Sequence, residues 1–179
     1  MGSKWTDNPA RFGLVSRLLH WGMAAIFAWQ FIGMILLAAL GETPFTLFFI
    51  GTHATLGVLL FLLVALRLAW GVKNARRRPS HGFSFSGKIA RVGHAALYGL
   101  MLLVPVLALL RSYGSGRAFA PLGIPFWGSS EDKISWMVIA GDAAHGLLAW
   151  GLLALIVGHA GIAIWHRVAN RDDLWQRMV

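Results

Sequence analysis

The chain has 179 residues, of which 57% are apolar and 13% are charged, whereas a soluble domain carries about 25% charged residues. This length suits a single domain, whose surplus of apolar side chains must face lipid. The absence of cysteine excludes disulfides, thiolate metal sites, iron–sulfur clusters and covalently attached haem. Sixteen Lys and Arg against seven Asp and Glu give a net charge of +9, and the position of these charges decides between a nucleic-acid and a membrane partner.

Four apolar stretches are each long enough to cross the roughly 30 Å of a bilayer's hydrocarbon, so the sequence predicts an all-α membrane protein with a four-helix bundle. The stretches cover about 14–40, 45–72, 89–110 and 134–166. A short turn joins the first two, and a basic loop joins the second to the third. The last connection is longer and is rich in Gly, Pro and aromatic residues.

The basic residues are divided unevenly between the two ends of this bundle. Thirteen of the sixteen Lys and Arg lie in the N-terminal segment, the second connection with its helix ends, and the C-terminal tail. Only Arg111, Arg117 and Lys133 lie on the other side. The positive-inside rule therefore predicts that both termini are cytoplasmic. Because topology alone accounts for the basic residues, we expect membrane lipid and no nucleic acid as a partner.

Histidines recur at matching depths in three of the four spans. His145 and His159 on the fourth span are 14 residues apart, which is just under four helical turns and roughly 21 Å along the helix. His20 in the first span and His53 in the second differ in depth by a similar amount, counted from the turn between them. Since the helices alternate in direction, His20 lies level with His159, and His53 lies level with His145.

Ionisable side chains inside a membrane are costly and usually functional, so these four histidines predict two haems, each held between two imidazoles. Such iron has no open coordination position, which suits electron transfer. One alternative is a structural or transport protein whose histidines bond neighbouring helices. Zinc is another, but tetrahedral zinc needs more clustered ligands, and His53 and His145 have only Asp142 nearby.

Other residues fall close to these histidines. Arg67 follows His53 by 14 residues, so it is expected either to pair with a haem propionate or to extend to the interface. His94, at the start of the third span, could compete with His20 for His159, or bond a propionate or a quinone. Nearby glycines either let a ring approach the backbone or allow close helix packing: Gly22, Gly57, Gly146, Gly158 and Gly161. His81 is expected to lie in solvent, and His166 is expected to lie at the membrane interface.

Several short motifs accompany these residues. They are Ser16-Arg17-Leu18-Leu19-His20-Trp21, His53-Ala54-Thr55-Leu56-Gly57, Arg67-Leu68-Ala69-Trp70, Gly93-His94, Gly116-Arg117-Ala118-Phe119 before Pro121-Leu122-Gly123, and the spacing from His145 to His159. Together they resemble the bacterial cytochrome b561 family over nearly the whole chain. The resemblance implies one transmembrane domain over residues 1–179 in the bacterial inner membrane. It further implies two haem b groups, ligated by His20 with His159 and by His53 with His145, with His94 not an axial ligand.

Stand-alone members of that family exchange electrons with ubiquinone, and one branch oxidises periplasmic superoxide. The resemblance thus implies a superoxide:ubiquinone oxidoreductase, an enzyme of the stand-alone type. Arg111, Arg117 and Lys133 would steer the anion toward the haem of His53 and His145, unless they are ordinary solvated loop charges. Related larger cytochromes anchor dehydrogenases, so the alternative is an electron-transfer membrane subunit between a redox protein partner and the quinone pool.

Overall fold

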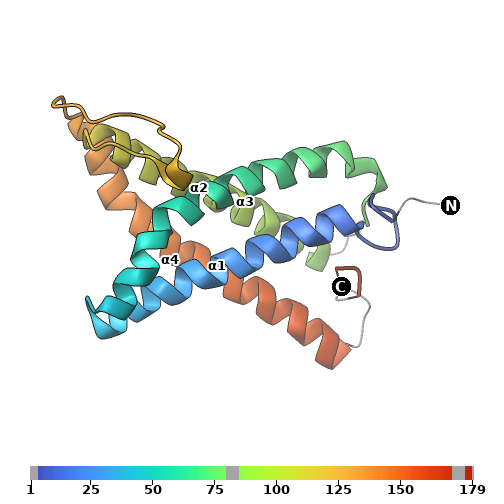
Figure 1. Ribbon diagram of the computed structural model, residues 1–179. Helices are drawn as coiled ribbons and strands as arrows, with labels where there is room; N and C mark the ends of the chain where they lie inside the picture. The colour runs from blue at the N-terminus through green and yellow to red at the C-terminus, as the bar shows by residue number, and fades with distance from the viewer. Residues whose placement is uncertain (1–3, 80–84, 171–175, 179) are drawn as a thin grey trace.

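The computed structural model describes residues 4–79, 85–170 and 176–178, so His81 lies outside the described residues. Four long helices dominate the chain, and the described residues contain no strand (Figure 1). They are α1 (Leu14–Leu40), α2 (Pro44–Lys73), α3 (Phe85–Gly114) and α4 (Ser135–Trp165). Each has a stretch with mean hydropathy between 2.0 and 2.2 and is long enough to cross a membrane. The predicted all-α class with four spans is confirmed.

The helices begin and end close to the ends of the predicted apolar stretches. Local capping and polar extensions explain why the ends differ by a few residues. Before α2, the Thr43 hydroxyl accepts a hydrogen bond from the Thr46 backbone N–H, and the Thr46 hydroxyl accepts one from the Thr43 backbone N–H. Pro44 then occupies the first turn, where its missing N–H costs nothing. α3 is four residues longer at each end than the stretch 89–110, because a helix can continue past the hydrocarbon with polar side chains.

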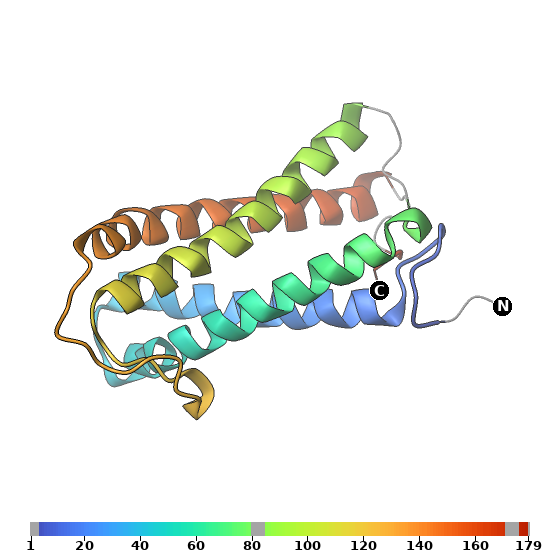
Figure 2. The same ribbon diagram turned by 90° about the horizontal axis from the view of Figure 1, so that it is seen from above.

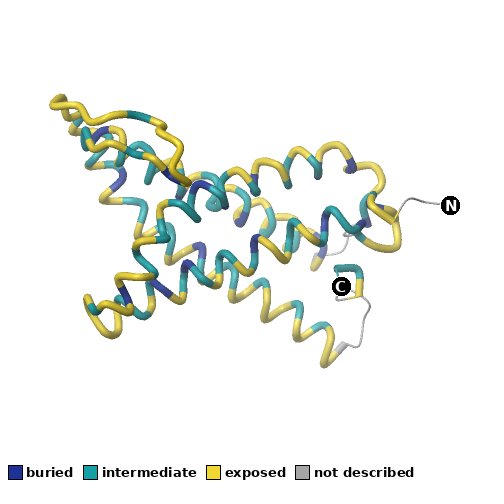
Figure 3. Tube along the Cα trace, viewed as in Figure 1, coloured by how far each residue is buried: buried dark blue, intermediate teal, exposed yellow. Residues whose placement is uncertain are grey.

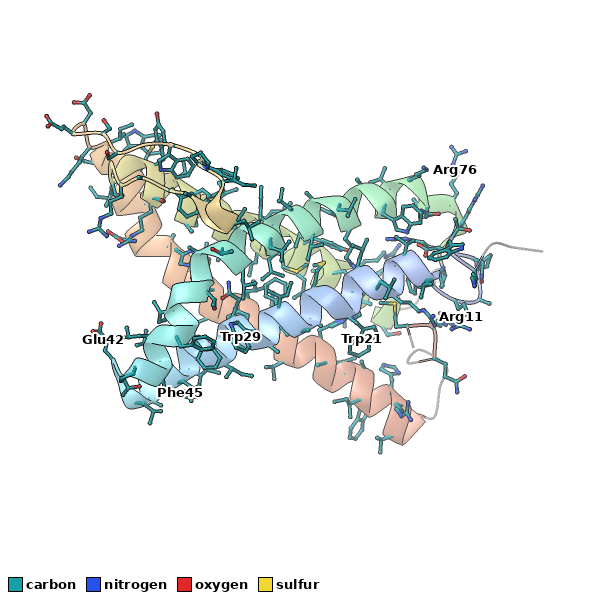
Figure 4. All side chains as sticks on the ribbon, viewed as in Figure 1. Arg11, Trp21, Trp29, Glu42, Phe45 and Arg76 are labelled. Atoms are coloured by element: carbon teal, nitrogen blue, oxygen red, sulfur yellow. The ribbon has the colours of Figure 1, made fainter. Side chains whose placement is uncertain are left out.

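The helices alternate in direction, so the structure has two distinct ends (Figure 2). Both described ends of the chain and the described residues that follow α2 (74–79) lie at one end, which we call the terminal end. The α1–α2 turn and the α3–α4 loop lie at the other, which we call the distal end. Figure 4 marks the ends with labelled side chains: Arg11 and Arg76 at the terminal end, Glu42 and Phe45 at the distal end.

Packing is closest within two hairpins, α1 with α2 and α3 with α4, while α2 and α3 make a smaller contact. Glycine allows both close approaches. A Cβ added to Gly33 in α1 would lie 2.6 Å from the Cβ of Phe49 in α2. A Cβ added to Gly141 in α4 would lie 2.8 Å from the Leu107 carbonyl oxygen of α3. The two hairpins are thus the closely packed units that carry the histidines.

The buried core is small, and many large apolar residues are exposed along the helices (Figure 3). Met23, Leu60 and Val64 form the centre of the core, with partly buried neighbours from α1, α2 and α3 packed around them. Val72 and Leu147, by contrast, are 77% and 74% exposed. Apolar exposure on this scale is unfavourable in water and is what a lipid-facing helix bundle presents.

Candidate functional site

Two pairs of histidines meet inside the bundle, one toward each end. The terminal-end pair joins His20 of α1 to His159 of α4, with imidazole ring centres 6.3 Å apart and an interplanar angle of 80°. The distal-end pair joins His53 of α2 to His145 of α4, with ring centres 6.2 Å apart and an angle of 83°. The structure therefore brings together the residues that their depths matched, and α4 contributes one imidazole to each pair.

The spacing of both pairs suits two imidazoles on opposite sides of one metal. A metal lies about 2.0–2.1 Å from each ligating nitrogen, and the ring centre lies about 1.1 Å further back, so opposed ring centres are about 6.3 Å apart. His94 also approaches His159, but their ring centres are only 5.2 Å apart. At that distance His94 and His159 are too close to stand opposite each other across a metal.

One imidazole of the distal-end pair is oriented by the backbone of α3. The Nδ1 atom of His145 lies 3.0 Å from the carbonyl oxygen of Val104, so a proton on Nδ1 is donated to that oxygen. In a neutral ring this bond places the proton on Nδ1, so Nε2 is the nitrogen that can ligate a metal. On the partner helix, the Gln30 amide donates to the His53 carbonyl oxygen at 2.9 Å, which ties α1 to α2 beside the pair.

The glycines near the histidines do not make close helix packing. An added Cβ would meet nothing within 4 Å at Gly22, Gly146, Gly158 or Gly161. Gly57 differs from these, because it follows His53 by four residues and so lies on the same helix face. There an added Cβ would lie 3.7 Å from the Gln30 amide nitrogen, which is an ordinary contact. Gly57 is thus the one of these glycines that shares a helix face with its neighbouring histidine.

The described part of the chain does not assemble the ligands of a tetrahedral metal site. Within the described ranges, no group of three or more His, Cys, Asp or Glu side chains converges closely enough to hold a metal ion. Asp142, the carboxylate nearest in sequence to His145, instead pairs with Arg111. The donor set of each pair is two imidazoles alone, which is incomplete for zinc and complete for a planar macrocycle that supplies the remaining four ligands.

Comparison with known sequences agrees with this geometry. The sequence model of the prokaryotic cytochrome b561 family matches residues 11–179 of the chain. The chain belongs to that family. It is similar to cytochrome b561 homolog 2 of Escherichia coli (strain K12), with 29% identity over 98% of this chain and 94% of the relative. The protein is therefore a haem b-binding, multi-pass membrane cytochrome that transfers electrons.

Arg67 extends into the bundle of this cytochrome from α2. Its Nε donates to the Tyr98 hydroxyl of α3 at 2.9 Å, and its Nη1 donates to the Ser16 carbonyl oxygen of α1 at 2.8 Å. Ser16 precedes His20 by one helical turn, so Arg67 lies beside the terminal-end pair. These bonds direct the guanidinium toward neighbouring helices and leave Nη2 available to a carboxylate.

A buried polar cluster supports Arg67, and the sequence did not indicate it. The Asp7 side chain is inaccessible to solvent, and its carboxylate accepts from the Ser16 hydroxyl at 2.7 Å, the Gly13 N–H at 2.9 Å and Arg78 Nε at 2.9 Å. Trp70 Nε1 also donates to the Ser16 hydroxyl, at 3.1 Å. The one available signal was that Ser16 lies one turn before His20, on the same helix face.

The three cations expected to steer an anion have different surroundings. The Arg111 Nε donates to the Asp142 carboxylate, so the charge of Arg111 is neutralised by an ion pair. Arg117 lies in the α3–α4 loop, where its carbonyl oxygen accepts from Trp127 Nε1. Lys133 is exposed and follows Asp132, which lines a pocket of about 400 Å³ in the same loop. Only Arg117 and Lys133 thus retain a charge for steering.

Proposed function

We propose that this cytochrome holds two haem b groups and passes single electrons between the two faces of the membrane. His20 and His159 would ligate one haem, and His53 and His145 the other. The observation that carries the proposal is the repeated pair of imidazoles, 6.3 and 6.2 Å between ring centres, on an α4 spacing of roughly 21 Å. Bound haem supplies reversible one-electron chemistry, and two imidazoles close its iron to other ligands.

The residues around each pair would perform separate tasks. The Val104 carbonyl oxygen holds His145 in its ligating tautomer. Arg67 presents an unused guanidinium nitrogen beside the terminal-end pair, where it would bind a haem propionate. His94 would contact a propionate or a quinone without ligating iron, because its ring lies 5.2 Å from that of His159.

For its substrates, we propose ubiquinone and periplasmic superoxide, in the bacterial inner membrane with both termini cytoplasmic. The orientation is supported by the sequence, in which thirteen Lys and Arg fall in the N-terminal segment, the second connection with its helix ends and the C-terminal tail, against three elsewhere. The distal-end haem would then face the periplasm and accept one electron from superoxide, which leaves as dioxygen. Two superoxide anions, oxidised one after the other, would supply the two electrons that ubiquinone takes up with two protons near the haem of His20 and His159. Arg117 and Lys133 would steer the anion.

Stopped-flow mixing of the oxidised protein with superoxide tests this proposal. We expect haem reduction faster than in a heat-denatured control, and reoxidation when ubiquinone is added. Neutralising both remaining cations, Arg117→Gln with Lys133→Gln, is expected to slow the second-order reaction about tenfold and to weaken its dependence on ionic strength. Haem reduction no faster than in the denatured control would remove superoxide as a substrate.

A second candidate is an electron-transfer subunit that serves a dehydrogenase or another redox protein. The Arg111–Asp142 ion pair favours it, because that pair removes one of the three cations that an anionic substrate needs. The distal end also has three Lys and Arg against four Asp and Glu, a net charge of −1. This candidate predicts co-purification with a redox protein that reduces the haems, and no fast reaction with superoxide alone.

A further inference from the structure

Each histidine pair has an arginine near it, and only one of the two arginines has a carboxylate partner. Near the distal-end pair, Arg111 is bound to Asp142, which precedes His145 by three residues. Near the terminal-end pair, Arg67 bonds only the Tyr98 hydroxyl and the Ser16 carbonyl oxygen, both neutral. In the described part of the chain, Arg67 therefore keeps its full positive charge.

The cluster behind Arg67 does not cancel that charge. Asp7 is the one acidic side chain in the cluster, and its Oδ2 atom is engaged by Arg78, which makes the two together neutral. Ser16 links them to Arg67 through its hydroxyl and its carbonyl oxygen. The cluster thus holds the guanidinium in place and leaves the positive charge of Arg67 uncancelled near His20.

We propose that Arg67 makes the haem of His20 and His159 the higher-potential haem of the two, so that electrons run from the distal end to the terminal end. The inference rests on the proposed function. A haem with two neutral imidazoles loses one unit of positive charge when its iron is reduced, so a fixed cation nearby stabilises the reduced form. If a propionate pairs with Arg67, the difference persists, because the described arginine on a helix beside the distal-end pair, Arg111, is already paired with Asp142, and Arg117 lies in the α3–α4 loop.

The distribution of charge along the molecule acts in the same direction. Among the described residues, the terminal end has twelve Lys and Arg against one Asp, a net charge of +11, whereas the distal end has a net charge of −1. Haem held by His20 and His159 would therefore have a higher reduction potential than haem held by His53 and His145, which favours electron transfer from the distal end to the terminal end. The electron donor is then expected at the distal end and the two-electron acceptor, the quinone, at the terminal end.

A redox titration of the purified full-length cytochrome, followed by haem absorbance, tests the inference. The wild type should show two one-electron waves. In Arg67→Gln, the midpoint potential of the higher wave should fall by at least about 59 mV, which corresponds to a tenfold change in the ferrous-to-ferric ratio. The midpoint potential of the lower wave should stay unchanged. Arg67→Lys keeps the charge and should keep most of the potential. The matched control, Arg111→Gln with Asp142→Asn, removes a neutral pair and should leave the higher wave unchanged.

Movement of the lower wave alone in Arg67→Gln, or of neither wave, would overturn the inference. If Arg67→Gln binds a single haem, that haem must titrate with the lower wave of the wild type. A surviving haem at the higher potential would contradict the assignment. A wild-type protein with one haem per chain would instead contradict the proposed function, and the inference with it, so the two failures are distinguishable.

Discussion

The two histidine pairs have almost the same ring geometry in very different surroundings. Ring centres are 6.3 Å apart at the terminal end and 6.2 Å apart at the distal end. The distal-end pair is held by the Val104 carbonyl oxygen and has a neutralised ion pair nearby. The terminal-end pair has an uncompensated arginine and a buried polar cluster beside it. The comparison teaches that imidazole spacing decides what can bind, while the surrounding charges distinguish one site from the other.

Removing one ligand is the largest disturbance of this comparison. In His145→Ala, we expect the distal-end haem to be lost because one axial ligand and its bond to Val104 disappear together. Haem content, measured as the pyridine haemochrome, should fall from about two per chain to about one. The remaining haem should show the higher of the two wild-type potentials, as assigned to His20 and His159.

The control for this experiment is His94→Ala, which removes a histidine from the same region of the bundle as His159. Because the His94 ring is too close to His159 to be an opposed ligand, this variant should keep two haems per chain. Loss of a haem in His94→Ala, with retention of both in His20→Ala, would reverse the proposed ligand assignment at the terminal end.

A bulky side chain on the same helix face as a ligating histidine is expected to reduce haem binding almost as strongly as removal of the histidine. Gly57 lies one turn after His53, and an added Cβ there meets only the Gln30 amide, at 3.7 Å. Gly57→Leu should therefore lower the occupancy of the distal-end haem while the helices still form. The matched variant Gly22→Leu places the same side chain two residues after His20, on nearly the opposite face, and should keep both haems. Equal haem loss in both variants would show that Gly57 has no special role.

The sequence was sufficient for the helices and for the depth of each histidine, because hydropathy and the 1.5 Å rise per residue are local properties. It could not choose between His20 and His94 as the residue opposite His159, because that choice depends on how far each helix is rotated about its own axis. The pairing of Arg111 with Asp142 likewise depends on how far α3 and α4 are each rotated about their own axes. Asp7 was missed for another reason, since its segment before α1 has no periodic pattern from which a fold can be predicted.

The last prediction concerns thermal stability rather than haem content, where we expect the smallest effect. It compares the ion pair of Asp7 with Arg78 and the ion pair of Asp142 with Arg111. Asp7 is fully buried and accepts three hydrogen bonds, so Asp7→Ala leaves Arg78 and Ser16 without their acceptor; breaking a buried pair costs about 3–5 kcal/mol. Asp142→Ala breaks an ion pair whose side chains are more than half exposed, which is worth about 0–1 kcal/mol. Thermal loss of the haem absorbance band in detergent should therefore occur at a clearly lower temperature in Asp7→Ala and be nearly unchanged in Asp142→Ala. If the two variants melted alike, the cluster around Asp7 would not be the rigid support of Arg67 that the potential difference between the two haems requires.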